Sequence, residues 1–141
     1  MILLDTSGLL SAIDAAQRHH EACAAALAAA KGPLLLSPFV LAELDYLLGA
    51  RVGQAAQAVL LDEVARGAYQ LEPFDAEDVR MARLVIGRYA DLEVGLADAS
   101  IVVLAARHGA KEILTLDARH FGALRQLNGR AFRLIPGSRS D

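Results

Sequence analysis

Short apolar runs alternate along this chain with longer segments in which apolar residues recur at helical spacing. Strands are predicted over residues 1–4, 34–36, 69–74, 113–116 and 131–135. Helices are predicted directly after residue 5, over residues 18–30, 38–48, 54–66, 76–89 and 121–124, and in a segment that ends at residue 108. Strands that alternate with helices are typical of a mostly parallel central sheet with helices on both faces. The sequence therefore predicts an α/β fold with three layers.

Capping residues indicate several of the helix boundaries. Ser37 at the cap and Pro38 in the first turn open the helix that follows the second strand. Asp75 is placed to cap the helix after the third strand, and Asp78 in its first turn suits the helix dipole. Gly109 is placed to end a helix in the left-handed conformation. These positions fix where the predicted helices meet the loops.

Four acidic residues are placed where such a fold would bring them together. Asp5 and Asp117 each follow a strand-like run, MILL and EILTL. The carboxyl ends of parallel strands lie along one edge of a sheet, where ligands of α/β proteins bind. Asp98 opens the helix directly before the strand that leads to Asp117, and Glu43 lies one turn into the helix after the second strand. We expect the four carboxylates to be neighbours.

Each acid also has a structural explanation when it is taken alone. Asp5 and Asp117 are placed to cap helices, and Asp98 lies in a first turn that favours an acid. Glu43 is harder to explain in this way. Its neighbours in SPFVLAELDYLL are largely apolar, which predicts that its side chain has little access to solvent. A carboxylate in that place is costly without a partner.

Repulsion between the acids turns their proximity into a prediction about ligands. Two carboxylates about 4 Å apart repel by roughly 4 kcal/mol at an effective dielectric constant near 20. A group of four therefore requires a bound cation or the uptake of protons. Oxygen donors without a His or Cys cluster favour Mg²⁺ or Mn²⁺ over zinc, and such sites commonly serve phosphoryl chemistry. The sequence predicts a metal-dependent hydrolase of phosphodiesters.

The charge distribution bears on the substrate. A net charge of −3 argues against a protein that coats nucleic acid without specificity. Residues 118–141, however, hold five arginines and one acid, a local charge of 5 − 1 = +4. Phosphate contacts and a solvated face are equally compatible with these arginines. For His120, three residues after Asp117, we favour a structural role over RNA contact. The candidate RNA contacts are Arg119, His120, Arg125, Arg130 and Arg133.

The composition predicts a soluble cytoplasmic protein. The apolar runs are far shorter than the roughly 18 residues that would suggest a membrane span. The start of the chain has no basic segment before Asp5, and the single cysteine, Cys23, fits a reducing compartment. We expect one domain over residues 1–141, with a frayed tail over about 136–141.

Four segments together resemble the PIN domain, and more closely the VapC-type toxins of bacterial type II toxin–antitoxin systems. They are DTSGLL, SPFVLAEL, GLADASIVVLAARHG and TLDARHF, in the family's order and spacing. The resemblance covers essentially the whole chain. It implies a PIN-like fold and an endoribonuclease that cleaves structured RNA, a tRNA or an rRNA loop, and so inhibits translation.

The resemblance also implies a metal site and partners. Asp5, Glu43, Asp98 and Asp117 match the acidic quartet of the family, which binds Mg²⁺ or Mn²⁺, with Asp5 and Asp98 as the more direct ligands. Supporting polar positions are matched by Thr6, Ser7 and Thr115. The family implies an antitoxin, and an arginine of that partner would neutralise the acids without metal. The apolar helices leave room for a homodimer interface and for a groove that binds an antitoxin helix.

Two other functions are compatible with parts of the sequence. A phosphatase like the haloacid dehalogenases also has a strand that ends in Asp, but it requires a second Asp two residues later, where this chain has Ser7. It also requires a downstream lysine, and this chain has only Lys31 and Lys111. A non-catalytic PIN-like scaffold would instead use the acids to contact a basic partner protein. Metal binding distinguishes the enzyme from the scaffold.

Overall fold

A five-stranded sheet forms the centre of the protein. The structure is a computed structural model that describes residues 1–137, so most of the predicted frayed tail lies outside the described residues. The strands are β1 (Ile2–Leu4), β2 (Leu34–Leu36), β3 (Gln70–Leu71), β4 (Glu112–Leu114) and β5 (Arg133–Ile135). Their order is β3-β2-β1-β4-β5, and every neighbouring pair is parallel. The prediction of a mostly parallel sheet is confirmed.

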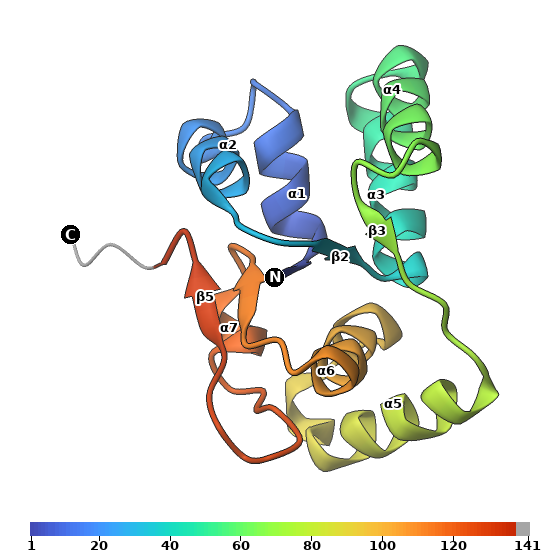
Figure 1. The fold of residues 1–141 in the computed structure, drawn as a ribbon, viewed down its shortest axis with the longest axis vertical. Helices are drawn as coiled ribbons and strands as arrows, with labels where there is room; N and C mark the ends of the chain where they lie inside the picture. The colour runs from blue at the N-terminus through green and yellow to red at the C-terminus, as the bar shows by residue number, and fades with distance from the viewer. Residues whose placement is uncertain (138–141) are drawn as a thin grey trace.

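Helices cover both faces of this sheet. They are α1 (Thr6–Ile13), α2 (His20–Ala29), α3 (Pro38–Arg51), α4 (Gln54–Ala65), α5 (Ala76–Arg88), α6 (Leu96–His108) and α7 (Ala118–Phe121), with a 3₁₀ turn at Ala90–Leu92. In Figure 1, α1 and α2 lie on one side of the sheet and α5 and α6 on the other. Leu3 and Leu4 on the central strand are fully buried between these layers. None of the helices within residues 1–137 is long and apolar enough to cross a membrane.

The predicted caps are present. The Ser37 side chain accepts a hydrogen bond from the backbone N–H of Phe39 at 3.1 Å. Asp75 and Asp78 form a reciprocal capping box at the start of α5. Gly109 ends α6 with a φ of 65°, a left-handed conformation that glycine adopts without strain. Local side-chain chemistry therefore sets these boundaries as expected.

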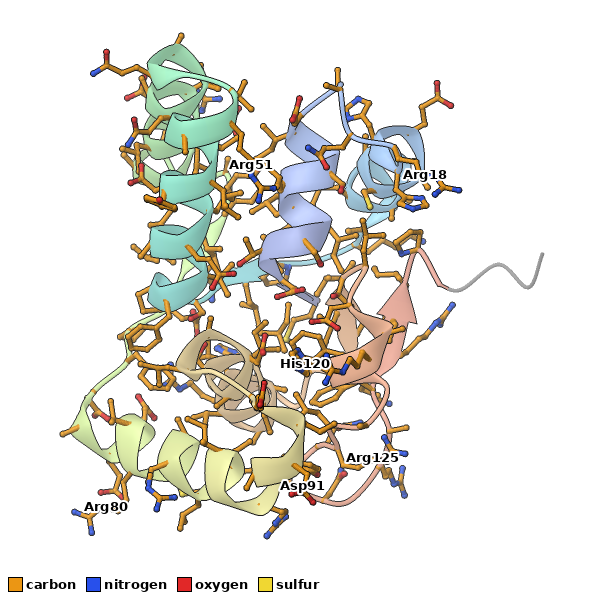
Figure 2. All side chains as sticks on the ribbon, turned by 180° about the vertical axis from the view of Figure 1, so that it is seen from behind. Arg18, Arg51, Arg80, Asp91, His120 and Arg125 are labelled. Atoms are coloured by element: carbon orange, nitrogen blue, oxygen red, sulfur yellow. The ribbon has the colours of Figure 1, made fainter. Side chains whose placement is uncertain are left out.

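The helix α3 is longer than predicted. The helix was predicted to end at residue 48, but α3 continues through Gly49 to Arg51. A Cβ atom on Gly49 would lie only 3.3 Å from the side chain of Gln57 in α4. Glycine at this position therefore allows α4 to pack closely and does not end the helix. The added turn carries Arg51, whose side chain lies between α3 and α1 (Figure 2).

Smaller differences occur at strand ends. The strand predicted over 69–74 is reduced to Gln70–Leu71, since Pro73 has no N–H to donate and interrupts pairing. The predicted helix over 121–124 begins earlier, at Ala118, because Asp117 caps it by accepting a hydrogen bond from the N–H of His120 at 3.0 Å. This shift brings His120 into the helix and next to the acid that precedes it.

One glycine positions the start of α1 against the sheet. A Cβ atom on Gly8 would lie 2.4 Å from the backbone oxygen of Leu114. Only glycine allows α1 to pass this close to the end of β4. As a result, Asp5 and Ser7 at the start of α1 meet the residues that follow β4.

Candidate active site

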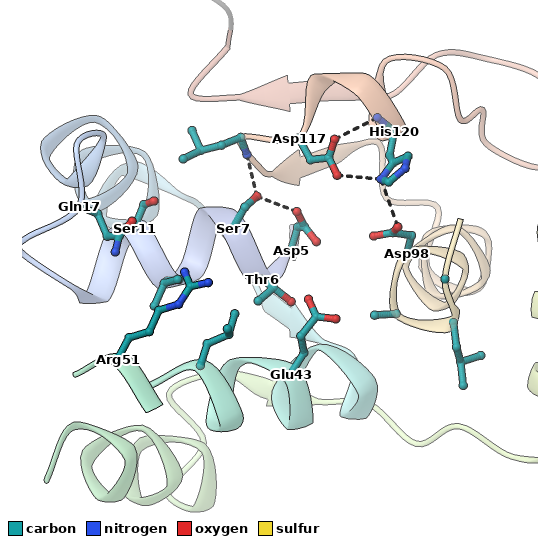
Figure 3. Close-up of a pocket in the computed structure, with 16 residues that line it drawn as sticks. Asp5, Thr6, Ser7, Ser11, Gln17, Glu43, Arg51, Asp98, Asp117 and His120 are labelled. Atoms are coloured by element: carbon teal, nitrogen blue, oxygen red, sulfur yellow. Dashed lines mark hydrogen bonds and ion pairs between the residues drawn. The ribbon is translucent and has the colours of Figure 1, made fainter. Parts of the chain in front are cut away.

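All four predicted acids line one pocket beside the carboxyl ends of β1 and β4 (Figure 3). The pocket has a volume of about 480 Å³. Each acid comes from a different part of the chain: the β1–α1 junction, α3, the first turn of α6 and the β4–α7 junction. The lining acids are Asp5, Glu43, Asp98 and Asp117. The parallel topology therefore brings together residues that are up to 112 positions apart in the sequence (117 − 5).

Asp5 is held by hydroxyl groups and not by the helix that it precedes. It occupies the cap position of α1, but its side chain makes no capping hydrogen bond. Its Oδ2 atom accepts hydrogen bonds from Ser7 Oγ at 2.8 Å and Thr115 Oγ1 at 2.7 Å. Burial raises the pKa of Asp5 in spite of these bonds, and the charge of Asp117 acts in the same direction. The explanation of Asp5 as a simple helix cap is therefore wrong.

The two hydroxyl groups also fix the loop after β4. Ser7 Oγ accepts a hydrogen bond from the backbone N–H of Leu116 at 3.0 Å. Thr115 Oγ1 accepts one from the N–H of Asp117 at 2.9 Å. Ser7 and Thr115 thus connect the acid that ends β1 to the segment that presents Asp117.

The pKa of Asp98 reflects the proximity of the other acids in the pocket. Its pKa is raised to about 6, first by burial and then by the negative charges of Asp5, Asp117 and Glu43, while His120 opposes the shift. The side chain is 19% exposed at the first turn of α6. The negative charge in the pocket therefore remains only partly compensated by the protein.

Glu43 differs from the prediction, because its side chain is exposed. The expectation of little solvent access was wrong. The buried face of α3 is formed by Val40, Leu44 and Leu48, which recur every four residues. Glu43 lies beside this stripe, on the face that lines the pocket. The apolar residues around Glu43 in the sequence therefore do not bury its side chain.

His120 pairs with two of the acids. Its Nδ1 atom lies 2.8 Å from Asp117 Oδ2 and 3.5 Å from Asp98 Oδ2, and its Nε2 atom lies 2.9 Å from the backbone oxygen of Leu92. Both ring nitrogens therefore face atoms that only accept hydrogen bonds. Burial alone would lower the pKa of His120, but the Leu92 bond and the charges of Asp117 and Asp98 raise it overall. His120 is thus part of the pocket and in contact with its acids, and RNA contact by His120 stays a prediction.

The donor set fits a hard divalent cation in its chemistry. Carboxylate oxygens dominate the pocket, as Mg²⁺ and Mn²⁺ prefer. Within residues 1–137, Thr6 Oγ1 is the one buried side-chain polar atom without a hydrogen-bond partner, and Thr6 lines this pocket. As the side chains stand, no three acids, histidines or cysteines of residues 1–137 are arranged to hold one ion. The contacts of His120 with Asp98 and Asp117 direct these carboxylates towards the ring instead.

The predicted arginines lie elsewhere. None of the four is among the residues that line this pocket in the described chain: Arg119, Arg125, Arg130 and Arg133. Arg125 donates to the backbone oxygens of its own loop, including Gly122 at 2.8 Å, and Arg133 lies 3.8 Å from Glu112. Their contact with RNA stays a prediction. The arginine that does line the pocket is Arg51, which the sequence analysis did not select because its helix was expected to end before it.

Comparison with known proteins agrees with this geometry. The PIN domain family model matches residues 2–126. Ribonuclease VapC26 of Mycobacterium tuberculosis (strain ATCC 25618 / H37Rv) is 43% identical over 135 residues, which are 96% of this chain and 100% of that protein.

Solved structures share the fold. The crystal structure of Mycobacterium tuberculosis VapC20, described as a sarcin–ricin loop cleaving toxin, matches with a TM-score of 0.81 at 21% identity, over 87% of this chain and 95% of that chain. FitAcB from Neisseria gonorrhoeae matches with a TM-score of 0.66 at 21% identity, over 94% of this chain and 97% of that one. The family match and the extended similarity to VapC26 show that the chain belongs to the PIN domain family.

Proposed function

We propose that this protein is the toxin of a type II toxin–antitoxin system, an endoribonuclease that depends on Mg²⁺ or Mn²⁺ and inhibits translation. The observation that carries the proposal is the position of four carboxylates from separate parts of the chain in one pocket, and the raised pKa of Asp98 agrees with it. Such a concentration of negative charge favours binding of a cation. The similarity to Ribonuclease VapC26 over nearly the whole chain supports RNA as the substrate.

We assign the roles in the site as follows. Asp5 and Asp98 are the direct ligands, and Glu43 and Asp117 complete the site or hold water. Ser7 and Thr115 orient the Asp5 carboxylate through their hydrogen bonds of 2.8 and 2.7 Å, and the unpaired hydroxyl of Thr6 is available to a bound water. When bound, the metal would lower the pKa of a water molecule and neutralise charge at the scissile phosphate. The Nδ1 atom of His120 contacts both Asp98 and Asp117, so a bound metal would compete with the ring for these two carboxylates.

The substrate that we propose is a structured RNA, either a tRNA or an exposed rRNA loop. A pocket of about 480 Å³ is in the range of small-molecule sites, so it accepts a short part of a strand and not a duplex. The description of VapC20 as a sarcin–ricin loop cleaving toxin makes this loop a suitable first test.

The proposed partners are a cognate antitoxin and a second copy of the chain, in the cytoplasm. Exposed apolar side chains on α3 and α4 favour association, since Tyr46 is 73% exposed and Val59 is 55% exposed. We also propose that residues 1–141 act as one PIN domain. Because the chain belongs to that family, the haloacid-dehalogenase-like alternative is set aside.

The decisive assay measures cleavage of a sarcin–ricin loop RNA and of total tRNA by the purified protein. We expect cleavage with Mn²⁺ and loss of cleavage in EDTA. Asp5→Asn should lower the rate by about 10³-fold, which corresponds to about 4 kcal/mol of transition-state stabilisation. The exposed acid of α4 provides a matched control, since Asp62→Asn should cut at the wild-type rate. Equal cleavage rates for wild type and Asp5→Asn would show that Asp5 has no role in cleavage.

A non-catalytic scaffold is the second candidate. It is favoured by the pairing of His120 with Asp98 and Asp117, which shows that these acids readily accept a basic partner. A folded wild-type chain that cuts none of these RNAs under any metal condition would favour the scaffold.

A further inference from the structure

Arg51 occupies the wall of the pocket away from its acids. Glu43, Leu47 and Arg51 are spaced by four residues in α3, and all three line the pocket. Eight residues of helix correspond to about 12 Å along its axis, so Arg51 lies well beyond Glu43. Figure 3 shows the Arg51 guanidinium directed into the pocket on the side of Ser11 and Gln17. The pocket thus has an acidic part and a separate cationic part.

Within residues 1–137 the Arg51 side chain has no partner that it would help to hold in place. In residues 1–137 it forms no ion pair within 4.0 Å and no side-chain hydrogen bond, and the residue is exposed. Arg107 is different, because its guanidinium lies 3.5 Å from Glu72 and 2.5 Å from Asp78. The five donor N–H groups of Arg51 are therefore available to a ligand in the pocket.

A structural explanation for Arg51 exists and can be controlled. A cation in the last turn of a helix interacts favourably with the helix dipole. Arg88 has the same position in the last turn of α5 and does not line the pocket. The two arginines share the dipole interaction, so a comparison between them isolates the contribution of the pocket.

A cation in this place would favour the binding of RNA. An RNA strand that approaches four carboxylates is repelled by them, and the metal neutralises only the charge at its own centre. A guanidinium matches the geometry of a phosphate and binds it through two parallel hydrogen bonds. Ser11 and Gln17, which line the same end of the pocket, are uncharged and do not compete for the guanidinium as acids would.

We propose that Arg51 binds a backbone phosphate of the RNA next to the scissile one and so positions the strand across the acids. This inference rests on the proposed ribonuclease function. Arg51 is a substrate-binding residue, and no proton transfer is assigned to it. In this arrangement the strand would extend from the acids that follow β1 and β4 towards the end of α3.

Binding and cleavage measurements test the assignment. RNA affinity is measured over a range of salt concentrations in full-length protein carrying Asp5→Asn, so that the RNA stays intact. Adding Arg51→Ala should weaken binding about tenfold and reduce the log–log salt slope by about 0.7, the value for one phosphate contact of a single strand. In active protein, Arg51→Ala should lower kcat/KM at least tenfold, and Arg51→Lys should recover part of the loss. Arg88→Ala should match the parent in affinity, salt slope and rate.

The outcomes separate this inference from the function on which it rests. A wild-type chain that cuts no RNA contradicts the proposed function. A wild-type chain that cuts RNA while Arg51→Ala binds and cuts equally well contradicts only the role of Arg51. If Arg88→Ala lost as much affinity and activity, the effect would be assigned to the helix dipole. If Arg51→Ala lost antitoxin binding with unchanged RNA affinity, Arg51 would be assigned to the protein partner. Either result overturns the proposal.

Discussion

Asp5 and Glu72 expose the same small fraction of their surface to solvent, yet the protein shifts the pKa values of their carboxyl groups in opposite directions. Each residue is 5% exposed. Burial raises the pKa of Asp5, and the hydrogen bonds from Thr115 and Ser7 do not offset it. For Glu72, burial acts in the same direction, but hydrogen bonds from Gln70 and His108 and the charges of His108 and Arg107 lower the pKa overall.

The Asp5 carboxylate lies deeper in the protein than that of Glu72, and the two carboxylates also differ in their partners. Glu72 accepts a hydrogen bond from Gln70 at 2.9 Å, pairs with His108 and lies 3.5 Å from Arg107. Asp5 has hydroxyl groups as its nearest partners and another carboxylate in the same pocket. A compensated acid connects β3 to α6 and stabilises the fold. An acid without a cationic partner, such as Asp5, can instead be stabilised by a bound cation, and acids of this kind are often found in functional sites.

The largest effect on stability is expected at the compensated acid. Glu72→Ala should reduce the free energy of unfolding by roughly 2–4 kcal/mol, because it leaves His108 without its acidic partner and removes one of the two acids that pair with Arg107. Urea unfolding at pH 7 measures the change. Below its transition, this variant should retain RNA cleavage within about threefold, since Glu72 does not line the pocket.

A surface acid provides the control for that experiment. Glu77 is 70% exposed and pairs with Arg80 at 3.5 Å, so Glu77→Ala should change stability by less than about 0.5 kcal/mol. If Glu72→Ala were as stable as Glu77→Ala, the difference between the two buried acids would have no energetic basis.

The uncompensated acid should show the opposite sign. The pKa of Asp98 is raised from 3.8 to about 6, so the folded state binds more protons than the unfolded state in this range. Its contribution to stability is present below pH 4 and is lost as the pH rises through about 6. At pH 7.5 in EDTA, Asp98→Asn should therefore be more stable than wild type by roughly 1–3 kcal/mol.

The pH profile distinguishes this cause from a general packing effect. The advantage of Asp98→Asn should shrink as the pH falls from 7 to 4, whereas a packing effect would not depend on pH. The lowered pKa of Glu72 acts in the other direction, so its contribution to the wild-type fold is lost below about pH 4.5. A constant difference between wild type and Asp98→Asn over this range would contradict the account.

The sequence predicted the features that depend on local chemistry. The parallel sheet, the Ser37 and Asp75 caps and the left-handed Gly109 follow from periodicity and capping rules, and the structure has all of them. The four acids also lie together as expected, because strand order places them at one edge.

Features that depend on packing between distant segments were missed. The helix predicted to end at residue 48 continues to Arg51, and Gly49 within it lies close to the side chain of Gln57 in α4. Glu43 was expected to have little access to solvent because its neighbours are apolar. The periodicity of one helix does not specify which of its faces packs against the core, and the structure exposes Glu43. Arg51 was not among the predicted site residues. It lines the pocket only because α3 is longer than predicted and because α1 lies next to it.

Titration with Mn²⁺ tests the central claim most directly, namely that the four acids form a cation site. Free Mn²⁺ is followed by electron paramagnetic resonance at pH 7.5 in wild type, Asp98→Asn and the surface variant Asp62→Asn. We expect saturable binding by wild type and Asp62→Asn, with affinity reduced at least about tenfold in Asp98→Asn, a loss of about 1.4 kcal/mol. A folded wild-type chain that binds no Mn²⁺, or an Asp98→Asn variant that binds it equally well, would contradict the account.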